Sequence, residues 1–119
     1  MKPPRERTTM VTPTQLRNWP LPAGAESKYQ RGRVIVIGGA RKTPGGALLA
    51  GTAALRVGAG RLTLAVGESV AVPLAVAIPE AGVVGLAETL NGSVRGGDLD
   101  LLADELSAAD AAVKRSEER

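Results

Sequence analysis

The chain has 119 residues, which is the size of one ordinary domain and leaves no room for two. It contains no cysteine and no histidine, which excludes disulfides, zinc sites built from those residues, thiolate nucleophiles and histidine-dependent triads. The net charge of +3 is uneven, because residues 1–42 hold nine Lys or Arg against two Glu and residues 98–119 hold three against seven acidic residues. The basic part lacks interleaved aromatic residues and a helix-turn-helix pattern, so no nucleic-acid partner is expected.

Residues 1–27 are expected to form an irregular leader, because they contain five prolines and little apolar periodicity. A single helical turn is expected at 14–19, and Trp19 is a candidate for docking the leader onto the domain or for a subunit contact. No stretch approaches the ~20 apolar residues that cross a bilayer, and the leader lacks the apolar segment of a secretory signal. No membrane partner is therefore expected, and the expected location is cytoplasmic.

Regular structure is predicted from the first apolar run onward. Four consecutive β-branched residues at 34–37 predict a strand buried on both faces, which is typical of a parallel sheet. Residues 46–57 predict a helix, and residues 62–66 predict the next strand. One face of the helix carries only small residues, Ala47, Ala50, Gly51 and Ala54. Such a face lets the helix approach a sheet closely.

The alternation continues in the second half of the chain. A short helix is expected to run to Ala77 with Glu68 or Ser69 as its cap, and Pro73 fits it only in or near the first turn. Residues 83–86 predict a third strand. The order of strands and helices predicts a doubly wound α/β sheet with flanking helices.

A polar, glycine-rich turn at 91–97 leads to a last helix, for which Asp98 is the expected cap. Its apolar stripe is Leu99, Leu102 and Leu106, and its acidic residues are expected to form a solvated face without a metal. A fourth strand should begin within 108–113, but the charged residues 114–119 follow at once. The sheet is therefore expected to be unfinished.

A glycine-rich segment at 38–46 joins the first strand to its helix. Glycine permits positive φ and close backbone approach, and a helix N-terminus offers free N–H groups to an anion. The segment matches neither the dinucleotide fingerprint nor the phosphate-binding P-loop. Two interpretations stay open at this point: a phosphate or nucleotide site, and a tight turn without a ligand.

Several blocks of sequence closely resemble the beginning of one family, the ADP/ATP-dependent NAD(P)H-hydrate dehydratases, which are the carboxyl-terminal domain type of the YjeF proteins. The blocks are Ser-Lys-Tyr-Gln-Arg-Gly-Arg-Val-Ile-Val-Ile-Gly-Gly at 27–39, Thr-Pro-Gly at 43–45, Ala-Ala-Leu-Arg-Val-Gly-Ala-Gly at 53–60, Glu-Ser-Val at 68–70 and Pro-Glu at 79–80. Their order and spacing agree with the family over residues 12–110.

The resemblance implies a ribokinase-like fold with a mostly parallel sheet, and repair of hydrated NADH or NADPH. In the family, ADP or ATP phosphorylates the 6-hydroxyl of the hydrate, phosphate is eliminated, and Mg²⁺ neutralises the phosphate charge. It also implies that Gly46, where the family usually has Ala, contacts the hydrated cofactor, with Pro44, Gly45 and Gly39 lining the same site. The basic side chains near this loop, chiefly Lys28 and Lys42, are candidates for steering the anionic dinucleotide, although solvated surface charge is the commoner role for such residues.

The family's Asn-Ala-Gly-Thr-Gly-Asp motif, which supplies its catalytic Asp, has no counterpart in this sequence. No catalytic residue is therefore assigned, and the chain is expected to be a truncated or frame-shifted product that is inactive alone. We expect a leader at 1–27, the N-terminal portion of the dehydratase domain at 28–113 and a charged tail at 114–119. A full-length form is expected to be a homo-oligomer.

Two other functions stay open: a noncatalytic nucleotide-binding or assembly fragment, and a small-molecule kinase of the same fold.

Overall fold

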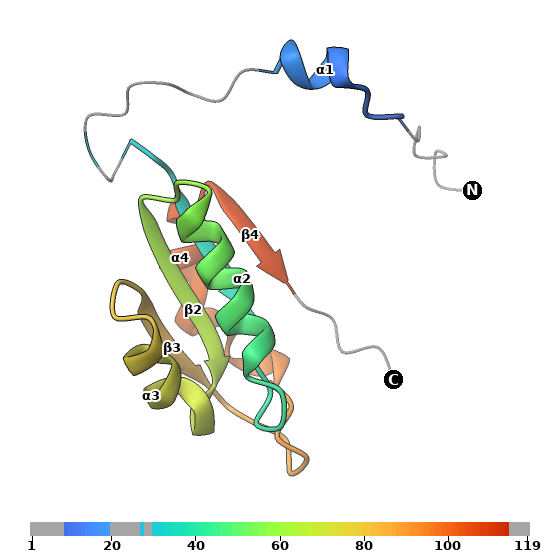
Figure 1. Ribbon diagram of the computed structural model, residues 1–119. Coiled ribbons are helices and arrows are strands. Elements are labelled where there is room, and N and C mark those ends of the chain that lie inside the picture. Colours follow the sequence, from blue (N-terminus) through green and yellow to red (C-terminus); the bar gives the residue numbers. More distant parts are fainter. Residues whose placement is uncertain (1–8, 20–26, 28–29, 115–119) are drawn as a thin grey trace, which may run out of the picture.

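A four-stranded parallel sheet forms the centre of the computed structural model, which describes residues 9–19, 27 and 30–114 (Figure 1). The strands are β1 (Arg33–Ile37), β2 (Arg61–Gly67), β3 (Gly82–Leu86) and β4 (Ala111–Lys114), and their order in the sheet is β3-β2-β1-β4. The first three strands progress outward from β1 on one side, and β4 pairs with β1 on the other. This arrangement confirms the doubly wound α/β sheet.

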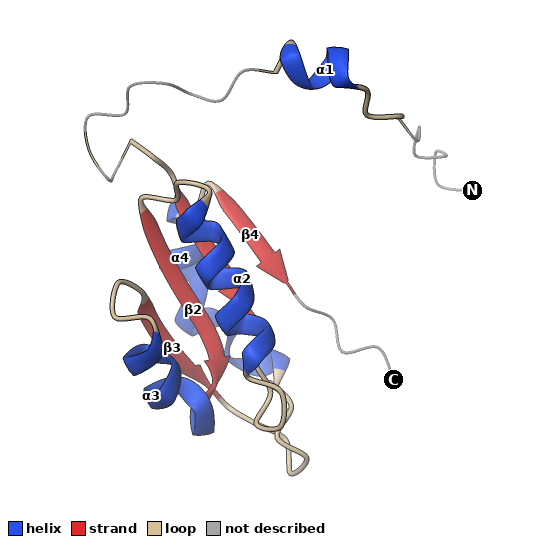
Figure 2. Cartoon of the chain, viewed as in Figure 1, coloured by secondary structure: helices blue, strands red, loops and turns tan. Residues whose placement is uncertain are grey.

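Helices cover both faces of the sheet (Figure 2). On one face, α2 (Gly45–Arg56) and α3 (Glu68–Ala77) pack on a core that contains Val36, Leu64 and Leu74. On the other face, the 3₁₀ helix η1 (Gly96–Leu102) and α4 (Ala103–Ala108) accompany a smaller core of Ile35, Ala65, Leu86 and Leu102. Because Ile35 and Val36 contribute to opposite cores, β1 is buried on both faces as its sequence predicts.

The small-residue face of α2 lies against the sheet, as expected. Ala47 and Gly51 are its buried residues, and a Cβ added at Gly51 would lie 3.0 Å from Leu64 Cδ2 and 3.1 Å from Leu62 Cδ2. A larger residue at position 51 would therefore push the helix away from β2. This close approach sets the position of the first turn of α2.

Two local expectations are wrong. Pro73 is the sixth residue of α3 and lies in its second turn, where it removes one backbone donor. Burial of Val70 and Leu74 against the sheet stabilises the helix on both sides of the proline. The last helix does not begin at a cap formed by Asp98: η1 starts at Gly96, and the Asp98 carboxylate accepts a hydrogen bond from the Ala87 N–H at 2.8 Å instead.

The expected helical turn in the leader is α1 (Pro13–Arg17), whose cap Thr12 accepts a hydrogen bond from the Gln15 N–H at 3.2 Å. The expectation that Trp19 docks onto the domain is wrong, because its side chain is 79% exposed. None of the helices within the described ranges has the length and the hydropathy needed to span a bilayer.

The fourth strand forms although none of its side chains is buried. Residues 111–114 are all exposed, yet each pairs with its partner in β1, from Val34–Ala111 to Ile37–Lys114. The strand thus includes Lys114, the first residue of the expected charged tail. Because β4 and β2 flank β1, the chain reverses its direction of winding between β1 and β4, where α/β sheets of this kind bind ligands.

Candidate functional site at the carboxyl edge of the sheet

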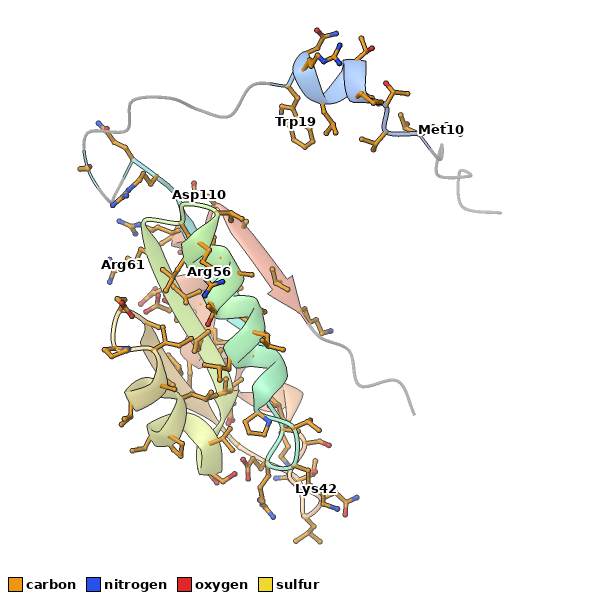
Figure 3. The ribbon with its side chains drawn as sticks, viewed as in Figure 1. Met10, Trp19, Lys42, Arg56, Arg61 and Asp110 are labelled. Carbon is orange, nitrogen blue, oxygen red and sulfur yellow. The ribbon has the colours of Figure 1, made fainter. Side chains whose placement is uncertain are left out.

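The glycine-rich segment leaves β1 at the carboxyl edge of the sheet, beside the position where the strand order reverses. Figure 3 shows Lys42 of this segment at the opposite end of the domain from Arg61 and Asp110, which mark the amino ends of β2 and β4. Parallel α/β sheets bind ligands outside the carboxyl ends of their strands. The segment therefore lies where the fold would place a ligand.

Gly39 gives the loop its shape. Its φ is +85°, and a Cβ there would lie 3.0 Å from Val66 Cγ1 and 3.3 Å from Ala47 Cβ. The loop is joined to β2 by two backbone hydrogen bonds, from the Gly38 N–H to the Ala65 carbonyl at 3.0 Å and from the Gly67 N–H to the Gly39 carbonyl at 3.1 Å. Gly39 is buried, so it shapes the turn that presents the neighbouring residues.

The first turn of α2 has free backbone donors. Pro44 is the N-cap residue and its side chain forms no capping hydrogen bond. Within the described residues, the Gly45 and Gly46 N–H groups have no hydrogen-bond partner. A Cβ at Gly45 would have no neighbour within 4 Å, so the backbone is open to a ligand. Free N–H groups and the positive end of the helix dipole together favour an anion or an electron-rich group.

The basic side chains near the loop have different positions. Lys42 is exposed beside the first turn of α2, which is compatible with steering an anion. Arg41 instead forms an ion pair with Glu88, with 2.9 Å between Nη2 and Oε2. Lys28 lies outside the described residues.

Glu88 is a residue of this edge that the sequence analysis did not single out. Its side chain is only 4% exposed, and besides Arg41 it accepts hydrogen bonds from the backbone N–H of Ser69, at 3.1 Å, and from the Ser69 hydroxyl. The hydrogen bonds from Ser69 and Arg41 hold the pKa of the Glu88 carboxyl below its ordinary value of 4.5. A signal was present in the sequence: Arg41, Ser69 and Glu88 each follow the end of a predicted strand, and parallel strands bring such positions together.

The described residues contain no cluster of three or more metal-ligating side chains. No three acidic side chains among them lie close enough to hold a metal ion.

Two hollows, of about 250 and 760 Å³, lie at the amino edge of the sheet, where their linings share Arg61, Thr63 and Glu105. Both hollows lie at the far end of the domain from the glycine-rich loop.

The architecture is that of a ribokinase-like α/β domain, and comparison with solved structures agrees. A ribokinase-like superfamily protein from Enterococcus faecalis superposes with a TM-score of 0.61 at 29% identity, over 78% of this chain and 29% of that one. A hypothetical protein from Streptococcus mutans superposes with a TM-score of 0.63 at 25% identity, over 83% of this chain and 33% of that one.

Sequence comparison identifies the family. The model of the NAD(P)H-hydrate dehydratase family matches residues 34–113, and the chain belongs to this family. It is 51% identical over 113 residues, or 95% of its length, to the ADP-dependent (S)-NAD(P)H-hydrate dehydratase of Xanthomonas campestris pv. campestris, and covers 38% of that protein. It is 41% identical over 75 residues to the bifunctional NAD(P)H-hydrate repair enzyme Nnr of Synechocystis, covering 62% of this chain and 14% of that protein. The chain thus spans well under half of these relatives.

Proposed function

We propose that this chain forms the nicotinamide-binding wall of an ADP- or ATP-dependent NAD(P)H-hydrate dehydratase. In this proposal Pro44, Gly45 and Gly46 contact the hydrated nicotinamide, Gly39 shapes the turn that presents them, and Lys42 steers the phosphates of the dinucleotide. The nucleotide would phosphorylate the 6-hydroxyl of the hydrate, and loss of phosphate would restore the dihydronicotinamide ring. We assign no catalytic side chain to residues 1–119.

The observation that carries the proposal is the pair of unpartnered backbone N–H groups in the first turn of α2. The N–H groups of Gly45 and Gly46 lack partners within the described residues, and they lie at the carboxyl edge beside β1, where the sheet reverses its order. A neutral, small-residue surface with two free donors suits a polar, uncharged ring that carries an amide and a hydroxyl. The Xanthomonas and Synechocystis relatives are named for action on hydrated NAD(P)H.

Further parts of the proposal extend the expectations drawn from the sequence. We propose a cytoplasmic location and, for a full-length form, a homo-oligomer. We also propose the division into a leader at 1–27, a partial dehydratase domain at 28–113 and a charged tail at 114–119. We further propose that Mg²⁺ neutralises the phosphate charge during the reaction.

Two measurements on the purified chain test the binding role and the lack of turnover separately. Hydrated NADH titrated into ¹⁵N-labelled chain should shift the amide signals of Gly45 and Gly46 and leave those of the amino edge, such as Thr63, unchanged. Incubation with hydrated NADH, ADP and Mg²⁺ should not restore the near-ultraviolet absorbance of NADH. Shifts confined to the amino edge would contradict the proposed site.

Recovery of NADH absorbance would show that the chain catalyses the reaction alone and would contradict our assignment of no catalytic residue. Binding of ADP without binding of the hydrate would favour a noncatalytic nucleotide-binding fragment. Phosphorylation of an added small alcohol, without action on the hydrate, would favour a kinase.

A further inference from the structure

Glu88 connects three segments that are distant in the sequence. It follows the end of β3 at Leu86, and its carboxylate binds Arg41 from the loop after β1 and Ser69 from the first turn of α3. The three segments meet at the carboxyl edge, where β3, β2 and β1 lie in that order. A carboxylate that is 4% exposed and has partners on both sides holds these segments in one geometry.

The hairpin formed by residues 88–94 also holds the main chain of the loop. The Arg41 N–H donates to the Gly92 carbonyl at 2.9 Å, and Gly92 has a φ of +82° at the tip of the turn. A Cβ at Gly92 would lie 2.6 Å from Arg41 Cβ, so the two backbones are in close contact. The hairpin itself closes through the bridge between Glu88 and Val94. Arg41 is thus held at its backbone and at its guanidinium, three residues before Pro44.

The first turns of α2 and α3 differ in the hydrogen-bond partners of their backbone N–H groups. At α3, the Ser69 N–H and hydroxyl both donate to Glu88 Oε1, so a carboxylate of the protein occupies the positive end of that helix. At α2, the Gly45 and Gly46 N–H groups have no partner in the described part of the chain. A carboxylate of the protein therefore lies at the first turn of α3, whereas no capping side chain among the described residues lies at that of α2.

We propose that Glu88 is a positioning residue for the nicotinamide-binding loop: it holds Arg41 and closes the first turn of α3, and so presents the Gly45 and Gly46 amides to the ligand. This inference rests on the proposed function of the loop. Glu88 needs no contact with the substrate for this role, because it acts through Arg41.

Amide hydrogen exchange on the whole chain tests the inference without any ligand. In Glu88→Gln the hydrogen-bonded amides of the loop, those of Arg41 and Thr43, should exchange about tenfold faster, because a charge-assisted contact is replaced by a weaker one. The matched control is Glu80→Gln, which makes the same charge change at an exposed position beyond the amino edge, and it should leave these amides unchanged.

Arg41 variants separate positioning from general destabilisation. Arg41→Gln leaves the hydrogen bonds between Glu88 and Ser69 in place, so only the amides of the loop should exchange faster. This variant also provides the test if Glu88→Gln fails to fold. Arg41→Lys keeps the positive charge and should restore most of the protection. Unchanged exchange of the amides at positions 41 and 43 in both Glu88→Gln and Arg41→Gln would overturn the inference, as would failure of Arg41→Lys to differ from Arg41→Gln.

A second readout keeps this inference distinct from the proposed function. Hydrated NADH should bind Glu88→Gln about tenfold more weakly than the unaltered chain, which corresponds to the same contact energy. If the unaltered chain does not bind the hydrate, the proposed function fails, and the exchange data still decide whether Glu88 positions the loop. If the loop opens but the affinity is unchanged, positioning by Glu88 has no role in binding and the inference fails.

Discussion

Arg33 and Asp110 form a reciprocal pair across 77 positions of sequence. The Arg33 N–H donates to Asp110 Oδ2 at 2.8 Å, and the Asp110 N–H donates to the Arg33 carbonyl at 2.9 Å. Both bonds lie at the amino end of the β1–β4 pairing, next to the first registered pair, Val34–Ala111. Asp110 therefore aligns the edge strand β4 with the central strand β1, although the side chains of β4 are exposed.

We predict that Asp110→Ala weakens the docking of β4. Loss of the exposed side-chain acceptor should lower the free energy of unfolding by about 1 kcal/mol. The amides of 111–114 should exchange faster than those of β2, which hydrogen exchange detects. Asp110→Asn keeps an oxygen acceptor, so its free energy of unfolding should fall by less than that of Asp110→Ala. Equal protection of β4 in Asp110→Ala and the unaltered chain would contradict this role of Asp110.

The close packing of α2 on the sheet depends on the lack of a side chain at Gly51. Gly51→Leu should lower the free energy of unfolding by about 1–3 kcal/mol, because the new side chain would overlap Leu62 and Leu64. Chemical denaturation measures this difference. Ala53→Leu on the exposed face of the same helix is the control, and it should change stability by less than about 0.5 kcal/mol.

The smaller core depends on one leucine that neighbours an exposed leucine in the chain. Leu102 is 0% exposed, whereas Leu101 is 64% exposed. Leu102→Ala should cost about 2–5 kcal/mol of unfolding free energy through lost burial and a cavity. Leu101→Ala should cost much less, and the ratio of the two losses, measured by denaturation, tests the placement of η1. Similar losses would mean that η1 is rotated about its axis.

The contact that Glu88 makes should depend on pH in a definite direction. Because the folded state lowers the pKa of this carboxyl below 4.5, its stabilisation is complete above that value and is lost as the pH falls through the folded-state pKa. The difference in unfolding free energy between the unaltered chain and Glu88→Gln should thus be constant near neutral pH and shrink in acid. A difference that grows in acid would contradict the sign of the shift.

The proposed ligand site predicts different affinities for hydrated NADH in two variants of Gly46. Gly46→Ala gives the residue that is usual in the family and should retain binding of hydrated NADH. Gly46→Asp places a carboxylate in the first turn of α2, where it favours the helix. It should nevertheless weaken binding by about tenfold or more, because it occupies the free donors and repels the dinucleotide phosphates. Titration calorimetry measures both, and equal affinities would place the ligand elsewhere.

Local sequence patterns determined the strands, the helices and their order. The β-branched run at 34–37 can be buried only between two layers, and the small face of α2 can pack only on a sheet, so the doubly wound fold was predictable. The glycine-rich loop was also predictable as a carboxyl-edge feature, because it follows a buried parallel strand. The family resemblance implied which of its residues face a ligand, and this assignment stays a prediction.

Tertiary structure alone decided which distant groups meet. Pairing between β1 and β4 gives residues 111–114 a strand conformation that their own sequence only weakly favours, and packing of Val70 and Leu74 retains a helix around Pro73. The pairing of Glu88 with Arg41 and Ser69 depends on the order of three strands, which no local pattern encodes. Short-range periodicity reports which side of an element is buried, whereas the partners of a polar side chain are set by how the elements pack.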